Sequence, residues 1–459
     1  MSKTVVTFLS ILGVTACFTQ LQAQKGLRIE GRFIGAKPTV LVLSQYFGGD
    51  LMPVDTAVVG ADGRIVWEDK AGIPAGICRI QGIGRGIELI VGESQQFSFE
   101  ADSKDPIATI RFQHSSENTL FFNYQREVRA RYQRALAYRQ QMGIKDDSDP
   151  RWKSRFQELN ESIKKYVDSL FQKYPQSLAT RYLKSYQEPK LPVLPLKQLS
   201  SKDSAYLKSY TRAHYFDHSF LSDERMVYTP TVPARLERLL KSLPLLPKEE
   251  QLTIVDPILS QSKGTTELRK YLVSKLAQQL ELTPFPDADV VYDHIVQNYV
   301  QNEPELWEAG MLQKIKEIGE IKAKVAVGSV FPNLPLTDIN GNESRLESVK
   351  SDYTVLFFYD PGCNHCREAV PKLTTLANRF KDKILVYAVS LDAEEKPWKD
   401  FIEEFQTENF VNVRDTTRKI EFYKWGVLTY PTIYLLDREK KIVARWLNID
   451  QLSVYLLNR

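Results

Sequence analysis

The chain has 459 residues, enough for about three domains of ordinary size. Lysine and arginine total 61 against 57 acidic residues, so the net charge is only +4 and no basic field favours nucleic-acid binding. With 43% hydrophobic and 26% charged residues, the composition is typical of a globular protein. We therefore expect several folded domains and no nucleic-acid partner.

Residues 1–23 have the pattern of an export signal. Lys3 gives a positive start, a short apolar run follows, and Ala23 precedes the expected cleavage site. The apolar run is shorter than the roughly 20 residues that a membrane-spanning helix needs. We predict a signal peptide and an exported protein. The alternative is a lipid anchor at Cys17, which ends the weak lipoprotein-like sequence VTAC.

Residues 24–115 are predicted to form a β-rich domain. Short runs rich in Val, Ile and Phe are separated there by Gly, Pro and Asp. Asp62-Gly63 stands between two such runs and predicts a hairpin. Cys78 lies in the strand-like run GICRIQ, and we expect it to be a small packed residue of the core.

Residues 116–325 are predicted to form an α-helical domain, because apolar residues recur three and four positions apart on otherwise charged stretches. His214 and His218 stand four apart with Asp217 beside them, a spacing that a metal could use. The aromatic neighbours in HYFDHSF favour packing and hydrogen bonding instead.

Residues 326–459 show a third pattern. TVLFFYD and ILVYAVSLD are buried-strand runs, and each is followed by a helical pattern; the hairpin YPTIYLLDREKKIVARWL and a terminal helix complete the region. This alternation predicts an α/β sheet with helix-covered faces. The predicted fold class is thus multidomain, with an all-β domain, an α-helical domain and an α/β domain.

The sequence PGCNHC places two cysteines where a strand gives way to a helix. Cys363 would stand at the helix N-terminus, where unpaired amides and the helix dipole favour the nucleophilic thiolate. Cys366 lies one turn further, close enough to form a bridge. We predict that Cys363 attacks a partner's disulfide and that Cys366 resolves the mixed disulfide. The redox-active disulfide Cys363–Cys366 would then take the place of any other cofactor.

The neighbouring residues suggest how the thiolate is tuned. His365 would stabilise the thiolate if the imidazole lay near the sulfur, whereas Asp360 would oppose it by charge repulsion. A metal site at the cysteines and His365 would need a fourth ligand, and the sequence has no second Cys-x-x-Cys. We therefore predict no metal; a purely structural bridge is the remaining alternative.

Residues 327–459 resemble the thioredoxin-fold domains of the TlpA/ResA type, which are exported thiol–disulfide oxidoreductases. The matching stretches are FFYDPGCNHC, the helix proline Pro371 and YPTIYLLD. The resemblance implies a cis peptide bond between Tyr430 and Pro431, which would offer backbone groups to an extended substrate. The β-rich and helical regions resemble the domains that precede such thioredoxin domains in Gram-negative envelope proteins.

This resemblance implies a periplasmic location, cysteine-containing envelope proteins as substrates and an electron donor that the sequence does not identify. It favours reduction or isomerisation of disulfides over net oxidation, and it leaves a homodimer open. The alternative function is that of a binding or scaffold protein whose thioredoxin domain is weakly active or inactive.

Two positions depart from the relatives. Phe357 stands where classical thioredoxins keep a buried aspartate, and Ala369 stands where proteins of the ResA type carry a glutamate. Glu368 is adjacent to Ala369, but one residue turns a helix by about 100°, so its side chain would point elsewhere. The sequence therefore assigns no group to proton transfer.

Overall fold

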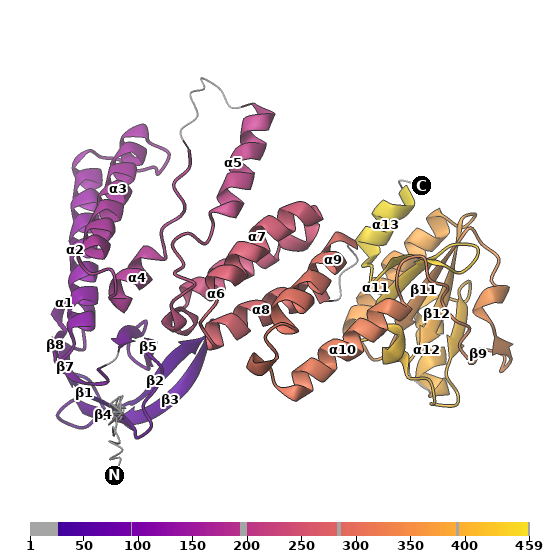
Figure 1. The fold of residues 1–459 in the computed structure, drawn as a ribbon, viewed down its shortest axis with the longest axis horizontal. Coiled ribbons are helices and arrows are strands. Elements are labelled where there is room, and N and C mark those ends of the chain that lie inside the picture. The colour runs from indigo at the N-terminus through magenta and orange to yellow at the C-terminus, as the bar shows by residue number, and fades with distance from the viewer. Residues whose placement is uncertain (1–25, 93, 193–199, 282–285, 392–393, 458–459) are drawn as a thin grey trace, which may run out of the picture. The chain divides into compact units, whose positions relative to one another are not determined.

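The computed structural model describes residues 26–92, 94–192, 200–281, 286–391 and 394–457 (Figure 1). The predicted signal peptide and the alternative anchor Cys17 lie outside these ranges. Contacts divide the chain into two compact units, one of residues up to 187 with 227–231, the other of 188–226 with 232–459. No helix within the described ranges is both long and apolar enough to cross a bilayer.

The first unit contains two four-stranded sheets, ordered β4-β1-β7-β8 and β3-β2-β5-β6. Their strands are β1 (Leu27–Ile34), β2 (Val40–Phe47), β3 (Asp50–Val58), β4 (Arg64–Asp69), β5 (Gly76–Gln81), β6 (Ile87–Val91), β7 (Gln96–Asp102) and β8 (Arg111–Gln113). β1 alternates buried and exposed residues along its whole length, which is the pattern of a strand with one face on a core. Cys78 is fully buried in β5, as predicted.

The predicted hairpin at Asp62-Gly63 is wrong in its strand pairing. A tight turn does form, since the amide of Gly63 donates to the carbonyl of Gly60 at 2.9 Å and Gly63 has a φ of +80°. However, β3 before the turn pairs with β2, and β4 after it pairs with β1. The chain therefore uses this turn to pass between the two sheets. A side chain at Gly63 would collide with the carbonyl of Phe33, which explains the glycine.

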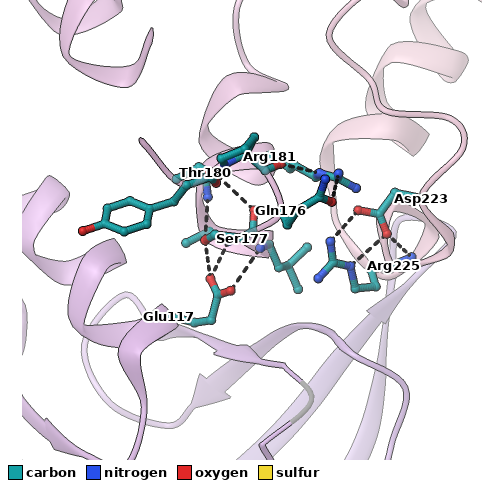
Figure 2. Close-up of polar contacts among 11 residues, drawn as sticks. Glu117, Gln176, Ser177, Thr180, Arg181, Asp223 and Arg225 are labelled. Atoms are coloured by element: carbon teal, nitrogen blue, oxygen red, sulfur yellow. Dashed lines mark hydrogen bonds and ion pairs between the residues drawn. The ribbon is translucent and has the colours of Figure 1, made fainter. Parts of the chain in front are cut away.

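Four helices follow in the same unit: α1 (Pro106–Thr109), α2 (Ser116–Gln141), α3 (Pro150–Lys173) and α4 (Leu178–Lys184). Glu117 caps the N-terminus of α4 (Figure 2): its carboxylate accepts hydrogen bonds from the Ser177 hydroxyl at 2.6 Å and the Ala179 amide at 2.9 Å. Buried Asn118 donates to the carbonyl of Ile90 in β6 and accepts from its amide. The Asn118 hydrogen bonds join α2 to β6, and the Glu117 hydrogen bonds join α2 to α4. These helices and the eight strands therefore belong to one compact unit.

The helices of the second unit are α5 (Ser201–Ala213), α6 (Thr231–Leu240), α7 (Lys248–Gln261), α8 (Glu267–Glu281), α9 (Pro286–Ile295) and α10 (Ala309–Lys324). A π-helical turn, Val296–Val300, continues α9. In α8 the residues Leu268, Leu272, Leu276 and Leu280 are all fully buried. Their spacing of four residues places them on one helix face, as the sequence periodicity predicts.

The second unit also contains a seven-stranded sheet, ordered β10-β9-β13-β12-β11-β14-β15. Its strands are β9 (Leu336–Asp338), β10 (Glu343–Ser344), β11 (Tyr353–Tyr359), β12 (Ile384–Ser390), β13 (Val411–Arg414), β14 (Thr432–Leu436) and β15 (Ile442–Arg445), and its helices are α11 (Asn364–Arg379), α12 (Glu395–Phe405) and α13 (Ile449–Leu457) (Figure 1). β11 runs parallel to β12 and antiparallel to β14. The predicted multidomain fold class, with all-β, α-helical and α/β parts, is confirmed.

β11 is buried on both faces, which explains its continuous apolar sequence. Phe357 and Tyr359 point into a core that α11, α12 and α13 complete. Leu356 and Phe358 point into a second core on the other face, together with Phe331 from the entry segment. The strand is thereby fixed between two cores, and its carboxyl end presents the segment that carries the cysteines.

A buried charge cluster joins α9 and α10 to this sheet within the second unit. Asp289 of α9 forms ion pairs with Lys322 of α10, at 2.8 Å, and with Arg445 of β15. Arg445 also donates to the carbonyl oxygens of Lys322 and Val325, both at 3.0 Å. Burial lowers the pKa of Lys322 to about 8 and that of Arg445 to about 10. The carboxylate of Asp289 therefore pairs with two cations, Lys322 and Arg445, that are largely shielded from water.

Candidate active site

The turn after β11 places Cys363 at the start of α11. The Asp360 carboxylate accepts from the Gly362 amide at 2.7 Å, and the Asp360 carbonyl accepts from the Cys363 amide at 3.1 Å. Cys363 is the N-cap of α11, and its sulfur accepts from the amide of Cys366 at 3.4 Å. The sulfur thus faces the unpaired amides of a helix N-terminus, an environment that stabilises negative charge.

The two cysteines differ in their exposure. Cys363 is partly exposed, whereas Cys366 is fully buried, and both are free thiols in this structure. Burial raises the pKa of the Cys366 thiol to about 12, because the apolar surroundings disfavour the charged sulfur. The pair therefore combines one accessible sulfur with one that is shielded and held protonated.

The loop before β14 brings a cis proline beside the first cysteine. Thr432 of β14 pairs with Phe358 of β11, so the residues just before Thr432 lie next to the N-terminus of α11. The peptide bond between Tyr430 and Pro431 is cis. The carbonyl oxygen of Tyr430 lies 3.8 Å from the Cys363 sulfur, and Tyr430 as a whole residue is 46% exposed. An accessible backbone edge therefore flanks the accessible sulfur.

The side chains of His365 and Glu368 are largely exposed to solvent. The His365 imidazole is 4.0 Å from the Glu368 carboxylate, and the two side chains are 83% and 79% exposed. Within the described ranges, no hydrogen bond joins His365 to Cys363. Asp360 contributes to the site by forming the turn that places Cys363 at the start of α11. The structure thus gathers Cys363, Cys366 and the cis-proline loop, and leaves His365 and Glu368 in water.

Phe357 and Ala369, the two positions without the expected acid, bring no polar side chain to the site. Phe357 is 1% exposed, and its ring stacks on that of Tyr359 with centroids 5.3 Å apart. Ala369 offers no polar group. Sequence reasoning missed Tyr359, a buried polar residue beside this position. The alternation of a strand could have found it, because residues two apart share a face.

Two histidines of the helical region, His214 and His294, bond to carboxylates, and the Nε2 of His294 lies 2.7 Å from the carboxylate of Asp256. His214 bonds to Asp217 at 2.9 Å, and its ring lies 4.1 Å from that of Tyr210. In the part of the chain that the structure describes, no three His, Cys, Asp or Glu side chains gather as a metal site would require.

The α/β region matches a known family. Residues 327–445 match the model of the AhpC/TSA family. The thiol-disulfide oxidoreductase ResA of Bacillus cereus is 28% identical over 139 residues, which are 29% of this chain and 79% of that protein. The thioredoxin-like protein YneN of Bacillus subtilis is 29% identical over 143 residues, 30% of this chain and 77% of that protein. This region is a thioredoxin-like domain of the AhpC/TSA family.

Through this thioredoxin-like domain, the chain is related to the thiol–disulfide oxidoreductases. A solved thioredoxin-like protein from Bacteroides caccae is 19% identical to the chain, with a TM-score of 0.48, and the match covers 59% of this chain and 98% of that one. The matches to ResA and YneN cover under a third of the chain. The family assignment therefore applies to the thioredoxin-like domain.

Proposed function

We propose that the chain is an exported, periplasmic thiol–disulfide oxidoreductase that reduces or isomerises disulfides of cysteine-containing envelope proteins. Its active site would be the Cys-Asn-His-Cys sequence from Cys363 to Cys366. The observation that best supports the proposal is the partly exposed Cys363 sulfur at the N-terminus of α11, one turn from a buried partner thiol.

In the proposed reaction, the Cys363 thiolate attacks one sulfur of the substrate disulfide. A Cys363–substrate disulfide forms, and the other substrate sulfur leaves as a thiolate that takes a proton from water. Cys366 then attacks the Cys363 sulfur, and its proton ends on the departing substrate sulfur. The substrate gains two electrons and two protons. The enzyme is left with the Cys363–Cys366 disulfide, which an electron donor of the envelope must reduce.

Removing the resolving thiol tests this proposal. Cys366→Ala leaves Cys363 able to attack but unable to complete the exchange, so mixed disulfides should accumulate in envelope extracts. They should appear as adducts that a thiol reductant releases and that mass spectrometry identifies. The matched control is the double variant Cys363→Ser/Cys366→Ala, which should form none. If Cys366→Ala also forms none, the enzymatic function is refuted and the alternative of a binding or scaffold protein takes its place. The apolar residues Phe357 and Ala369 agree with that alternative.

A further inference from the structure

A buried hydroxyl shares its core with the resolving cysteine. Tyr359, the last residue of β11, is 1% exposed and belongs to the same packed cluster as Cys366. Its ring stacks on that of Phe357, with centroids 5.3 Å apart, and on that of Phe401 of α12, with centroids 4.7 Å apart. These two contacts hold the ring inside the core that also contains Cys366.

This hydroxyl has no hydrogen-bond partner among the described residues, and neither has the indole N–H of Trp398 in α12. Buried polar groups without partners are rare in native proteins, so each calls for an explanation. Burial raises the pKa of Tyr359, and the hydroxyl therefore keeps its proton. The Trp398 indole opposes that rise in the pKa of Tyr359, and the charge of a Cys366 thiolate adds to it.

Cys366 is a buried thiol whose ionisation a hydrogen-bond donor would favour. It must become a thiolate to attack the mixed disulfide, yet it is buried among apolar side chains that disfavour a negative charge. Phe357 and Ala369, the positions where relatives carry acids, supply no polar group. An O–H donor beside the sulfur would lower the cost of forming the buried thiolate without adding a second charge.

We infer that the Tyr359 hydroxyl donates a hydrogen bond to the Cys366 sulfur as the thiolate forms in the resolving step, an inference that rests on the proposed function. Cys366 attacks the Cys363 sulfur, the bond from Cys363 to the substrate breaks, and the departing substrate thiolate takes up the proton that Cys366 has lost. Tyr359 keeps its own proton throughout. It acts on the second exchange and leaves the first attack, by exposed Cys363, unaffected.

Tyr359→Phe tests this inference, because it removes the hydroxyl and keeps the stacked ring. Reduced protein mixed with dithiobis-nitrobenzoate in a stopped-flow instrument should release thionitrobenzoate in two phases, first when Cys363 attacks and then when Cys366 displaces the second group. We expect an unchanged first phase and a second phase slowed about tenfold or more, the effect of losing one hydrogen bond to a charged sulfur. The pH midpoint of the second phase should rise.

Tyr387→Phe is the matched control. Tyr387 is a buried tyrosine of the neighbouring strand β12, it faces the opposite core, and its hydroxyl donates to the Ser344 carbonyl at 3.1 Å. Both phases should be unchanged in this variant. A second phase in Tyr359→Phe with the wild-type rate and pH midpoint would overturn the inference, as would equal slowing of both phases. A wild-type protein without the first phase would instead refute the proposed function.

Discussion

Cys363→Ser is expected to abolish reduction of protein disulfides. At neutral pH a serine hydroxyl does not ionise, so it cannot attack a disulfide sulfur as a thiolate does. Cys366 cannot substitute, because it is fully buried and burial raises its pKa to about 12. Loss of a catalytic nucleophile lowers turnover by about a thousandfold or more. Insulin reduction with a thiol reductant as the electron source measures this loss.

The control for that variant is Cys78→Ala. Cys78 is also a buried free thiol, but it lies in β5 of the other unit. Its replacement should leave insulin reduction unchanged, even where the small cavity lowers stability. Activity that survives Cys363→Ser, or that disappears equally in Cys78→Ala, would contradict the assignment of Cys363 as the nucleophile.

We expect Asp289→Asn to lower the free energy of unfolding more than any of the other substitutions. The substitution leaves the side chains of Lys322 and Arg445, which are 7% and 5% exposed, without the carboxylate that they share. Removing one partner of a buried ion pair leaves an uncompensated charge and typically costs about 3–5 kcal/mol. Chemical denaturation of the purified protein should show this loss in the transition that unfolds the second unit.

Asp293→Asn is the matched control, because Asp293 stands one turn further along the same helix, 4.0 Å from the same lysine. Its side chain is 59% exposed, and exposed ion pairs contribute about 0–1 kcal/mol. The two variants remove the same charge from the same helix and differ in burial. Equal, small losses in both would show that the cluster does not hold α9 and α10 to the sheet.

The sequence predicts the local features well because short-range patterns determine them. The apolar run of β11 and the helical pattern after it are enough to place Cys363 at a helix N-terminus, where the structure has it. The division into β-rich, helical and α/β regions likewise follows from local periodicity. The resemblance to known domains supplied the expectation about Tyr430 and Pro431, since few X-Pro bonds are cis.

Features that depend on long-range contacts could not be predicted from local sequence patterns. The turn at Asp62-Gly63 has hairpin residues, but tertiary packing assigns its two strands to different sheets. Nothing in the sequence links Asp289 to Arg445, 156 positions away. Strand alternation places Tyr359 on the same face as Phe357, but only its neighbours in the fold show that its hydroxyl has no hydrogen-bond partner within the described part of the chain.

The most direct test of the central claim is competitive alkylation of the reduced protein. Iodoacetamide, in limiting amount at neutral pH, reacts with accessible thiolates. Peptide mass spectrometry should find Cys363 modified at least about tenfold faster than Cys366, because Cys363 is partly exposed and Cys366 is buried with a raised pKa. Equal labelling of the two cysteines, or faster labelling of Cys366, would contradict an exposed nucleophile with a shielded resolving partner.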